Sequence, residues 1–511
     1  MLRKRLEARI AEIADRLDDD DDGDMRDVII QARRPAGPMR DIASRAAVAM
    51  RERMYSQSAR EVMPPSEDER EKLSRMSDDD AESRIVEMRS SMLAQAARAP
   101  VLKDAADAIS KAGHTAATAL LRNTSLSKVA ADAKEGKRSL GQLWLADGIA
   151  TKLHKDELAI LREESETIEN VYPNYRVKVP DFARVAGLPA TVTDNKTSSY
   201  GIDATGGLAS WGAYGSRGQG IRVAVLDTGI DAGHPDLAGK LAGFAEFDAS
   251  GNEVPGAPPR DAGQHGTHVT GTIVGGDANG SYIGMAPDAQ VLAGLVLPAG
   301  GTVAQIIAGM QWAVAKGADV INMSLGGLTT EAAVLNLFTV PMVNSLLAGI
   351  PVVVAIGNDG QQTTGDPGND LFAFAVGASD SDDKIAGFSG GRTHLLTDSV
   401  VVDPGLLPLP YMKPDISAPG VGVVSSVPGG GYAAFNGTSM ATPHVAGAVA
   451  LLLSNTSIKA QVSGPNRAFL IQDLLTSSVE ELGENGQDQR FGFGRLNVLR
   501  AIGLARELGF A

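Results

Sequence analysis

Residues 223–229, Val-Ala-Val-Leu-Asp-Thr-Gly, form an unbroken apolar run that stops at a carboxylate and a glycine. A strand that is buried on both faces of a parallel sheet requires a run of this kind. Comparable runs occur at residues 291–297, 320–323 and 351–356, and a helical spacing of apolar residues over 303–314 separates two of them. Because strands that alternate with helices build a parallel sheet covered on both faces, we predict an α/β, doubly wound domain over residues 201–511.

The chain before this domain has a different character. Residues 1–95 are rich in charge and begin with an amphipathic pattern that the acidic run 18–22 should end, so we predict charged helices and flexible links there. The helical pattern has its apolar side at Leu2, Leu6, Ile10, Ile13 and Leu17. Residues 115–180 combine a short amphipathic helix over 155–164 with strand-like stretches, which predicts a small α+β unit. Residues 181–200, which are polar and contain Pro189, are predicted to be a linker.

The overall composition restricts the classes of partner. The net charge of −15 argues against a nucleic-acid partner or an anionic membrane, because both would repel the chain. There is no cysteine, so the fold has neither disulfides nor thiolate metal sites. The first residues lack the apolar core of a secretory signal peptide, and no apolar run is long enough to span a bilayer. These features predict a cytoplasmic protein.

Three residues at strand ends or helix starts could carry chemistry. Asp227 ends the apolar run quoted above, His265 opens an apolar helical stretch, and Ser439 precedes another. Taken singly, the aspartate could be a turn residue, the histidine a metal ligand together with His268, and the serine a helix cap. Pro443 requires the last helix to begin near Ser439, since proline is tolerated only in a first turn. Together they supply a nucleophile, a base and a group that orients the base, in the chain order Asp, His, Ser.

These segments resemble the three signature blocks of the subtilase family. The block at residues 436–447, Asn-Gly-Thr-Ser-Met-Ala-Thr-Pro-His-Val-Ala-Gly, is the most specific of them. The resemblance extends from about residue 201 to residue 499. Further matches are at residues 324–327, 357–358, 413–420 and 493–498.

The resemblance implies a serine endopeptidase that hydrolyses polypeptide substrates. Ser439 would attack the scissile carbonyl, His265 would take its proton, and Asp227 would hold the imidazole in the required tautomer. Asn358 would contribute its side-chain amide to the oxyanion hole, the alternative being a turn residue. Backbone groups of the family's substrate strand would pair with an extended peptide. In this chain that strand is Ser324, Leu325 and Gly326.

Two features concern metals and access to the cleft. Many family members bind calcium, and Asp236 matches one ligand position, but residues 275–281 do not clearly reproduce the rest. The sequence therefore leaves a structural calcium open, and the chemistry requires no cofactor. Residues 380–419 are longer than the family's usual connection and contain the apolar loop 406–410, which suggests altered access or regulation. His268 and His444 lie beside small residues on helices and are expected to be structural.

The unit before the catalytic domain carries a second, shorter resemblance. Residues 155–158 and 169–174 resemble the last helix and strand of the family's propeptide, which assists folding and then blocks the cleft with its tail. This resemblance implies a zymogen that is inhibited by its own propeptide-like domain and cleaves itself within the linker. A permanent packing subdomain is the alternative. The competing function for the whole chain is that of an inactive scaffold that binds peptides. Residues 1–95 could also form a module that binds a protein partner, and this role is compatible with an active peptidase and with a scaffold.

Overall fold

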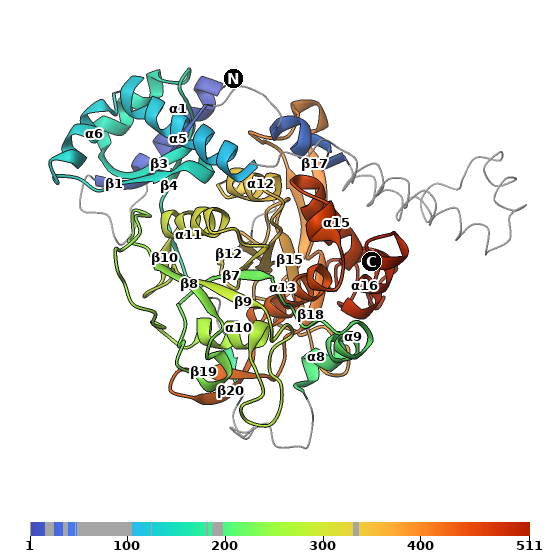
Figure 1. Cartoon of the computed structure of the whole chain (residues 1–511). Coiled ribbons are helices and arrows are strands. Elements are labelled where there is room, and N and C mark those ends of the chain that lie inside the picture. The colour runs from blue at the N-terminus through green and yellow to red at the C-terminus, as the bar shows by residue number, and fades with distance from the viewer. Residues whose placement is uncertain are drawn as a thin grey trace, which may run out of the picture.

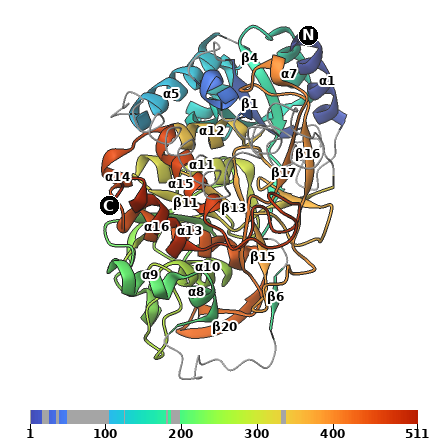
Figure 2. The same ribbon diagram turned by 90° about the vertical axis from the view of Figure 1, so that its right-hand side faces the viewer.

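The structure of the protein, a computed structural model, contains a large and a small α/β unit (Figures 1 and 2). The residues that it describes are 2–15, 25–33, 39–45, 47–48, 105–123, 125–179, 182–185, 198–330 and 337–511. Among the helices of these ranges, none combines the length and the apolar character needed to cross a bilayer.

A seven-stranded sheet, parallel throughout, forms the centre of the large unit, as predicted. Its order is β18-β15-β13-β11-β7-β9-β8. The strands are β7 (Arg222–Asp227), β8 (Leu241–Glu246), β9 (Gln290–Leu295), β11 (Val320–Met323), β13 (Val352–Ala355), β15 (Phe374–Ser379) and β18 (Ile416–Pro419). The chain adds β8 and β9 on one side of β7 and all later strands on the other. The strand order therefore reverses beside β7, where doubly wound sheets place their ligand crevice.

Helices cover both faces of this sheet because alternate side chains of each strand point to opposite faces. Leu226 of β7 belongs to a buried cluster with residues of α11 (Val303–Ala315) and α12 (Thr339–Leu347). Val225 belongs to a second cluster, with α10 (His265–Val274) and α13 (Thr438–Ser454). Figure 1 shows α11 and α10 on opposite sides of β9. The continuous apolar character of the strands is thus explained by burial on both faces.

The N-terminal unit comprises the described residues between 2 and 173 that build a four-stranded sheet and its helices. The sheet order is β2-β3-β1-β4. Its elements are α1 (Leu2–Asp15), β1 (Met25–Ala32), α5 (Ala105–Asn123), α6 (Ser127–Lys134), β2 (Leu140–Leu143), β3 (Gly148–His154), α7 (Lys155–Ile160) and β4 (Ile168–Pro173). In Figures 1 and 2 it lies against the face of the large unit formed by α11 and α12.

The position of β1 corrects the predicted division at residue 95. Residues 1–95 were expected to hold only helices and links, yet β1 pairs antiparallel with both β3 and β4. Val28 and Ile30 are buried in the core of the N-terminal unit together with Leu6 and Ile10 of α1. The amphipathic first helix is therefore present, but it and β1 complete the unit that the sequence placed at 115–180. The acidic run 18–22 lies outside the described residues.

The long connection 380–419 contains a hairpin that projects toward the N-terminal part of the chain. It consists of β16 (Arg392–Leu396) and β17 (Leu409–Lys413), paired antiparallel. Helical residues 39–48, as far as they are described, include Ala43, which belongs to the same large buried cluster as Leu409 of β17. The backbone N–H of Asp403 donates a hydrogen bond to the Ser44 hydroxyl at 2.9 Å. The insertion therefore contacts the N-terminal region.

Candidate active site

Asp227 and His265 form a buried pair where β7 ends and α10 begins. His265 Nδ1 lies 2.8 Å from Asp227 Oδ1 and 3.0 Å from Oδ2. The aspartate is fully buried and the histidine is 2% exposed. The backbone N–H of Thr228 also donates to Asp227 Oδ1, at 2.7 Å. Because the carboxylate lies at Nδ1, it holds a proton on that nitrogen and leaves Nε2 as the basic position of the neutral ring.

The turn after β7 is tied directly to the start of α10. Thr228 Oγ1 accepts from the backbone N–H of Gly266 at 2.9 Å and donates to Asp261 at 2.7 Å. A Cβ at Gly266 would lie only 2.1 Å from the carbonyl oxygen of Gly229. Glycine after His265 therefore permits the close approach that brings the imidazole to the aspartate.

Ser439 lies near the start of α13 and is linked twice to Ser324, which follows β11. The Ser439 Oγ donates to the Ser324 carbonyl oxygen at 3.2 Å, and the Ser324 Oγ donates to the Ser439 carbonyl oxygen at 2.9 Å. The helix begins at Thr438, close to Ser439 as predicted. Pro443 lies in its second turn, whereas the prediction placed it in the first. Proline has no N–H for the carbonyl four residues before it, and the Ser324 hydroxyl replaces that donor.

Asn358 follows β13, and its side chain is oriented by the residue before Ser439. Its Oδ1 accepts from the backbone N–H and from the Oγ1 of Thr438, both at 2.8 Å. Its Nδ2 faces Gly437, since a Cβ built on that glycine would be 3.3 Å from this atom. The amide donor group thus lies beside Gly437, two residues before Ser439 in the chain.

The structure does not contain every contact that a triad needs for catalysis. Within the described residues, His265 Nε2 is buried and has no hydrogen-bond partner. The Ser439 hydroxyl is directed to Ser324 instead. The His265 ring contacts the ring of Phe182, with centroids 5.1 Å apart. Sequence analysis missed Phe182, which it had assigned to a linker.

Residues 176–179 and 182–185, called the crossing segment here, form strand pairs with two different parts of the large unit. β5 (Arg176–Val177) pairs antiparallel with β10 (Gly301–Thr302), and the backbone N–H of Gly326 donates to the Lys178 carbonyl oxygen at 3.3 Å. Beyond it, β6 (Ala183–Arg184) pairs with β20 (Gly431–Asn436), which leads into α13. The predicted linker 181–200 therefore contains a short strand, and residues 180–181 and 186–197 lie outside the described residues.

The predicted substrate strand contributes unequally to these contacts. Gly326 provides the backbone pairing with the crossing segment, Ser324 contacts Ser439, and the Leu325 side chain is buried in the core. A substrate-binding role for the three residues stays a prediction.

The two other histidines near the site are structural in their surroundings. His268 Nε2 lies 3.1 Å from the carbonyl oxygens of Val423 and Ala433. His444 Nδ1 lies 2.8 Å from the carbonyl oxygen of Met440. Burial lowers the pKa of His268 to about 3 and that of His444 to about 4. Both rings are therefore neutral at neutral pH.

Asp236 has both carboxylate oxygens hydrogen-bonded to donors of the protein. Its Oδ1 accepts from the backbone N–H of Ala278 and its Oδ2 from the Tyr432 hydroxyl, both at 2.6 Å. In the described ranges, no three histidine, aspartate or glutamate residues gather in a way that could hold a metal ion. Calcium takes six to eight oxygen ligands, which include backbone and side-chain carbonyl oxygens, so a structural calcium at Asp236 stays a prediction.

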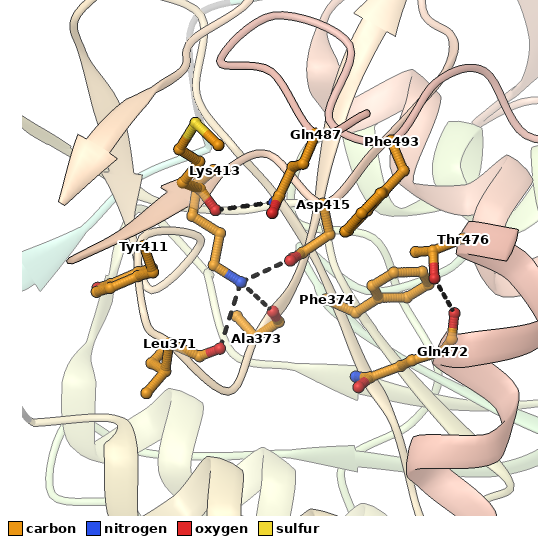
Figure 3. Close-up of a pocket in the computed structure, with 11 residues that line it drawn as sticks. Leu371, Ala373, Phe374, Tyr411, Lys413, Asp415, Gln472, Thr476, Gln487 and Phe493 are labelled. Carbon is orange, nitrogen blue, oxygen red and sulfur yellow. Dashed lines mark hydrogen bonds and ion pairs between the residues drawn. The ribbon is translucent and has the colours of Figure 1, made fainter. Parts of the chain in front are cut away.

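A separate pocket beside β17 contains none of the predicted catalytic residues (Figure 3). The buried Lys413 ammonium donates to the carbonyl oxygens of Leu371 and Ala373 and to Asp415 Oδ2. Asp415 Oδ2 also accepts from the backbone N–H of Ala375 at 2.7 Å. The segment 413–420, one of the family matches, therefore joins β17 to the sheet through a compensated ion pair.

Comparison with known proteins agrees with this geometry. Residues 218–494 match the model of the subtilase family. Subtilisin E of Bacillus subtilis (strain 168) is 38% identical over 297 residues, which cover 57% of this chain and 67% of that protein. Subtilisin of Bacillus pumilus is 38% identical over 297 residues, covering 57% and 93%, and Subtilisin Savinase of Lederbergia lenta is 41% identical over 288 residues, covering 56% and 91%. The fold and the site define a hydrolase with a serine nucleophile. The chain belongs to the subtilase family of serine endopeptidases.

Proposed function

We propose that the protein hydrolyses peptide bonds through a triad of Asp227, His265 and Ser439, and that it is made as a self-inhibited zymogen. The observation that carries the proposal is the buried 2.8 Å contact between His265 Nδ1 and Asp227, at the sheet edge where Ser439 begins α13. The structural histidines His268 and His444 contact only backbone carbonyl oxygens. His265 instead contacts a buried carboxylate through Nδ1, and its Nε2 is buried without a partner among the described residues.

The reaction follows from these positions. The Ser439 hydroxyl turns from the Ser324 carbonyl to His265 Nε2, gives up its proton there and attacks the scissile carbonyl carbon. Asp227 stabilises the imidazolium that forms. Asn358 Nδ2 and the backbone N–H of Ser439 stabilise the negative oxygen of the tetrahedral intermediate. His265 then donates the proton to the leaving amine, and water repeats the sequence on the acyl-enzyme. Catalytic hydrogen bonds commonly tighten only once substrate is bound, which accounts for the Ser439 orientation here.

The substrate is a polypeptide in extended conformation. The backbone edges at Gly301–Thr302 and Gly326 already pair with a strand of the chain itself, and a substrate would add to the same edges. Backbone pairing of this kind is independent of sequence, so it suits an endopeptidase that acts on many proteins.

The inhibitory role of the N-terminal unit rests on the crossing segment. This segment continues from β4 and pairs with β10 before residues 180 and 181 and with β20 after them. A peptide held in this way excludes other substrates. Phe182, directly after the two undescribed residues, contacts the His265 ring. We therefore place self-cleavage at this point, at the start of the predicted linker.

The N-terminal unit also has its own contacts with the large unit. Asn344 Nδ2 of α12 donates to the Leu145 carbonyl oxygen at 2.7 Å, and Gln311 Nε2 of α11 donates to the Gln142 carbonyl oxygen at 3.2 Å. These contacts would keep the unit bound after the cut. The cytoplasmic location and a partner for residues 1–95 stay predictions.

The test compares wild type with Ser439→Ala by mass spectrometry and by hydrolysis of a generic peptide. We expect wild type to be cut near residues 179–182 and to be active, and the variant to be folded, full length and inactive. Ser345→Ala, which removes an equally buried helical hydroxyl away from the site, should behave as wild type. Hydrolysis by Ser439→Ala would refute the triad. An active wild type that stays uncut would refute the zymogen and leave the triad standing.

A further inference from the structure

Asp366 is a buried carboxylate beside the peptide-binding edge that the mechanism above does not use. It ends β14 (Thr364–Asp366), which pairs with β12 (Gly327–Thr329) immediately after the substrate strand. The Tyr175 hydroxyl, just before β5, donates a hydrogen bond to Asp366 Oδ2. Asp366 Oδ1 is buried and has no partner among the described residues.

The neighbouring Asp370 is a buried carboxylate with a hydrogen-bond donor for each oxygen. Asp370 Oδ1 accepts from the backbone N–H of Phe372 at 2.9 Å, and its Oδ2 accepts from the Thr339 hydroxyl. Both donors belong to the large unit. Within the described residues, the Asp366 side chain receives its hydrogen bond only from Tyr175, which lies between the N-terminal unit and the crossing segment. A buried acceptor normally has a donor in its own domain, because an unmet one destabilises the fold.

The pKa of Asp366 agrees with a buried carboxylate whose negative charge is only partly stabilised by its surroundings. Burial raises the pKa of Asp366 to about 7, the Tyr175 hydrogen bond opposes this rise, and the charge of Asp370 adds to it. After self-cleavage and release of the N-terminal unit, Tyr175 leaves. The carboxylate then lacks this donor until a substrate supplies one.

The register of the bound strand shows which substrate residue would reach Asp366. Tyr175 and Val177 are two residues apart, so their side chains point to the same side of an extended chain. Val177 is fully buried in the cluster that contains Leu297 and Leu325, whereas Arg176 and Lys178 are exposed. The strand therefore inserts an aliphatic side chain and, two residues earlier, a hydrogen-bond donor.

We propose that Asp366 is a specificity-determining residue: it selects substrates with a donor side chain, tyrosine or lysine, two residues before the aliphatic residue that takes the place of Val177. This inference rests on the proposed function and extends it to a substrate class. It requires that Asp366 contacts the substrate side chain and takes no part in bond cleavage.

The experiment measures kcat/KM for fluorogenic peptides with the chain's own sequence 174–185, using the protein after self-cleavage and separation of the N-terminal unit. One peptide keeps tyrosine at the Tyr175 position, a second has phenylalanine, and a third and fourth have lysine and methionine. We expect wild type to prefer tyrosine over phenylalanine, and lysine over methionine, by about tenfold, the effect of one hydrogen bond to a charged group. Asp366→Leu should reduce both ratios to about one. Asp366→Asn, which keeps shape and polarity, should lose the lysine preference.

A control peptide with alanine at the Val177 position should lose kcat/KM equally in wild type and in both variants. Equal rates for tyrosine and phenylalanine peptides in wild type would overturn the inference while leaving the peptidase intact. Ratios that persist in both variants would also overturn it, because the selection would then come from other residues. If wild type cleaved none of the peptides, the proposed function itself would fail.

Discussion

Asn358 has its side-chain oxygen fixed by two donors of Thr438, and its amide nitrogen lies beside Gly437. A preorganised hydrogen-bond donor stabilises negative charge that develops only in the transition state. We therefore expect Asn358→Ala to lower kcat by about 10²–10³ with KM nearly unchanged, the loss that removal of this kind of donor causes in subtilisin.

Steady-state kinetics on a small peptide would check this expectation, with Asn369→Ala, a change at another buried asparagine of the large unit, as the control. If KM rose and kcat stayed constant, Asn358 would contact the ground-state substrate and would not act in the oxyanion hole.

Single residues of the site could be predicted where a local pattern marks them. Asp227 ends an apolar strand, and His265 and Ser439 start apolar helices, so each position is visible in a short stretch of sequence. The contacts between Ser324 and Ser439 could not be predicted in this way, because 115 residues separate them and no spacing rule connects them. Phe182 was missed for the same reason, since its contact with His265 depends on where the chain passes.

At the scale of elements, β5 is held by the Val177 side chain, which is fully buried in the large unit. Val177→Asp would place an unpaired carboxylate in that apolar site and displace the strand that presents the cleavage point to Ser439. We expect the rate of self-cleavage to fall by at least about tenfold. Gel and mass-spectrometric time courses on freshly expressed protein measure this rate.

Lys178→Asp is the matched control, because the neighbouring side chain is exposed and the same substitution should change the rate little. Each change is also made in Ser439→Ala, where the circular dichroism spectrum shows whether the chain still folds. Equal cleavage rates for the two aspartate variants would contradict a role of the Val177 site in presenting the segment.

Helices and strands could be predicted where a short, contiguous stretch of sequence marks them. Four strands of the parallel sheet, β7, β9, β11 and β13, are continuous apolar runs, so the fold class followed from composition and order. β1 was missed because its buried run is short and lies in a highly charged region. Its partners, β3 and β4, lie more than 100 residues away, beyond the range of any periodic pattern.

For the whole molecule, two buried histidines couple stability to pH. Burial lowers the pKa of His268 to about 3 and of His444 to about 4, whereas an unfolded chain has histidines with a pKa near 6.5. Below pH ~6.5 the unfolded state therefore binds protons that the folded state does not. The free energy of unfolding should fall as pH decreases from ~6.5 toward ~4, by about 1.4 kcal/mol per pH unit for each histidine.

Buried carboxylates act in the opposite direction, so a difference between variants is needed to isolate this effect. Burial raises the pKa of Asp366 and of Asp370, and their contribution to stability falls as pH increases above ~4. Urea unfolding at pH 7.5, 6 and 5, in the Ser439→Ala background that prevents autolysis, gives the slope of stability against pH. His444→Gln should reduce that slope by about 1.4 kcal/mol per pH unit, the contribution of one histidine. His154→Gln, at a half-exposed ring, should leave the slope unchanged. An unchanged slope in His444→Gln would mean that this ring is protonated in the folded protein, contrary to its burial.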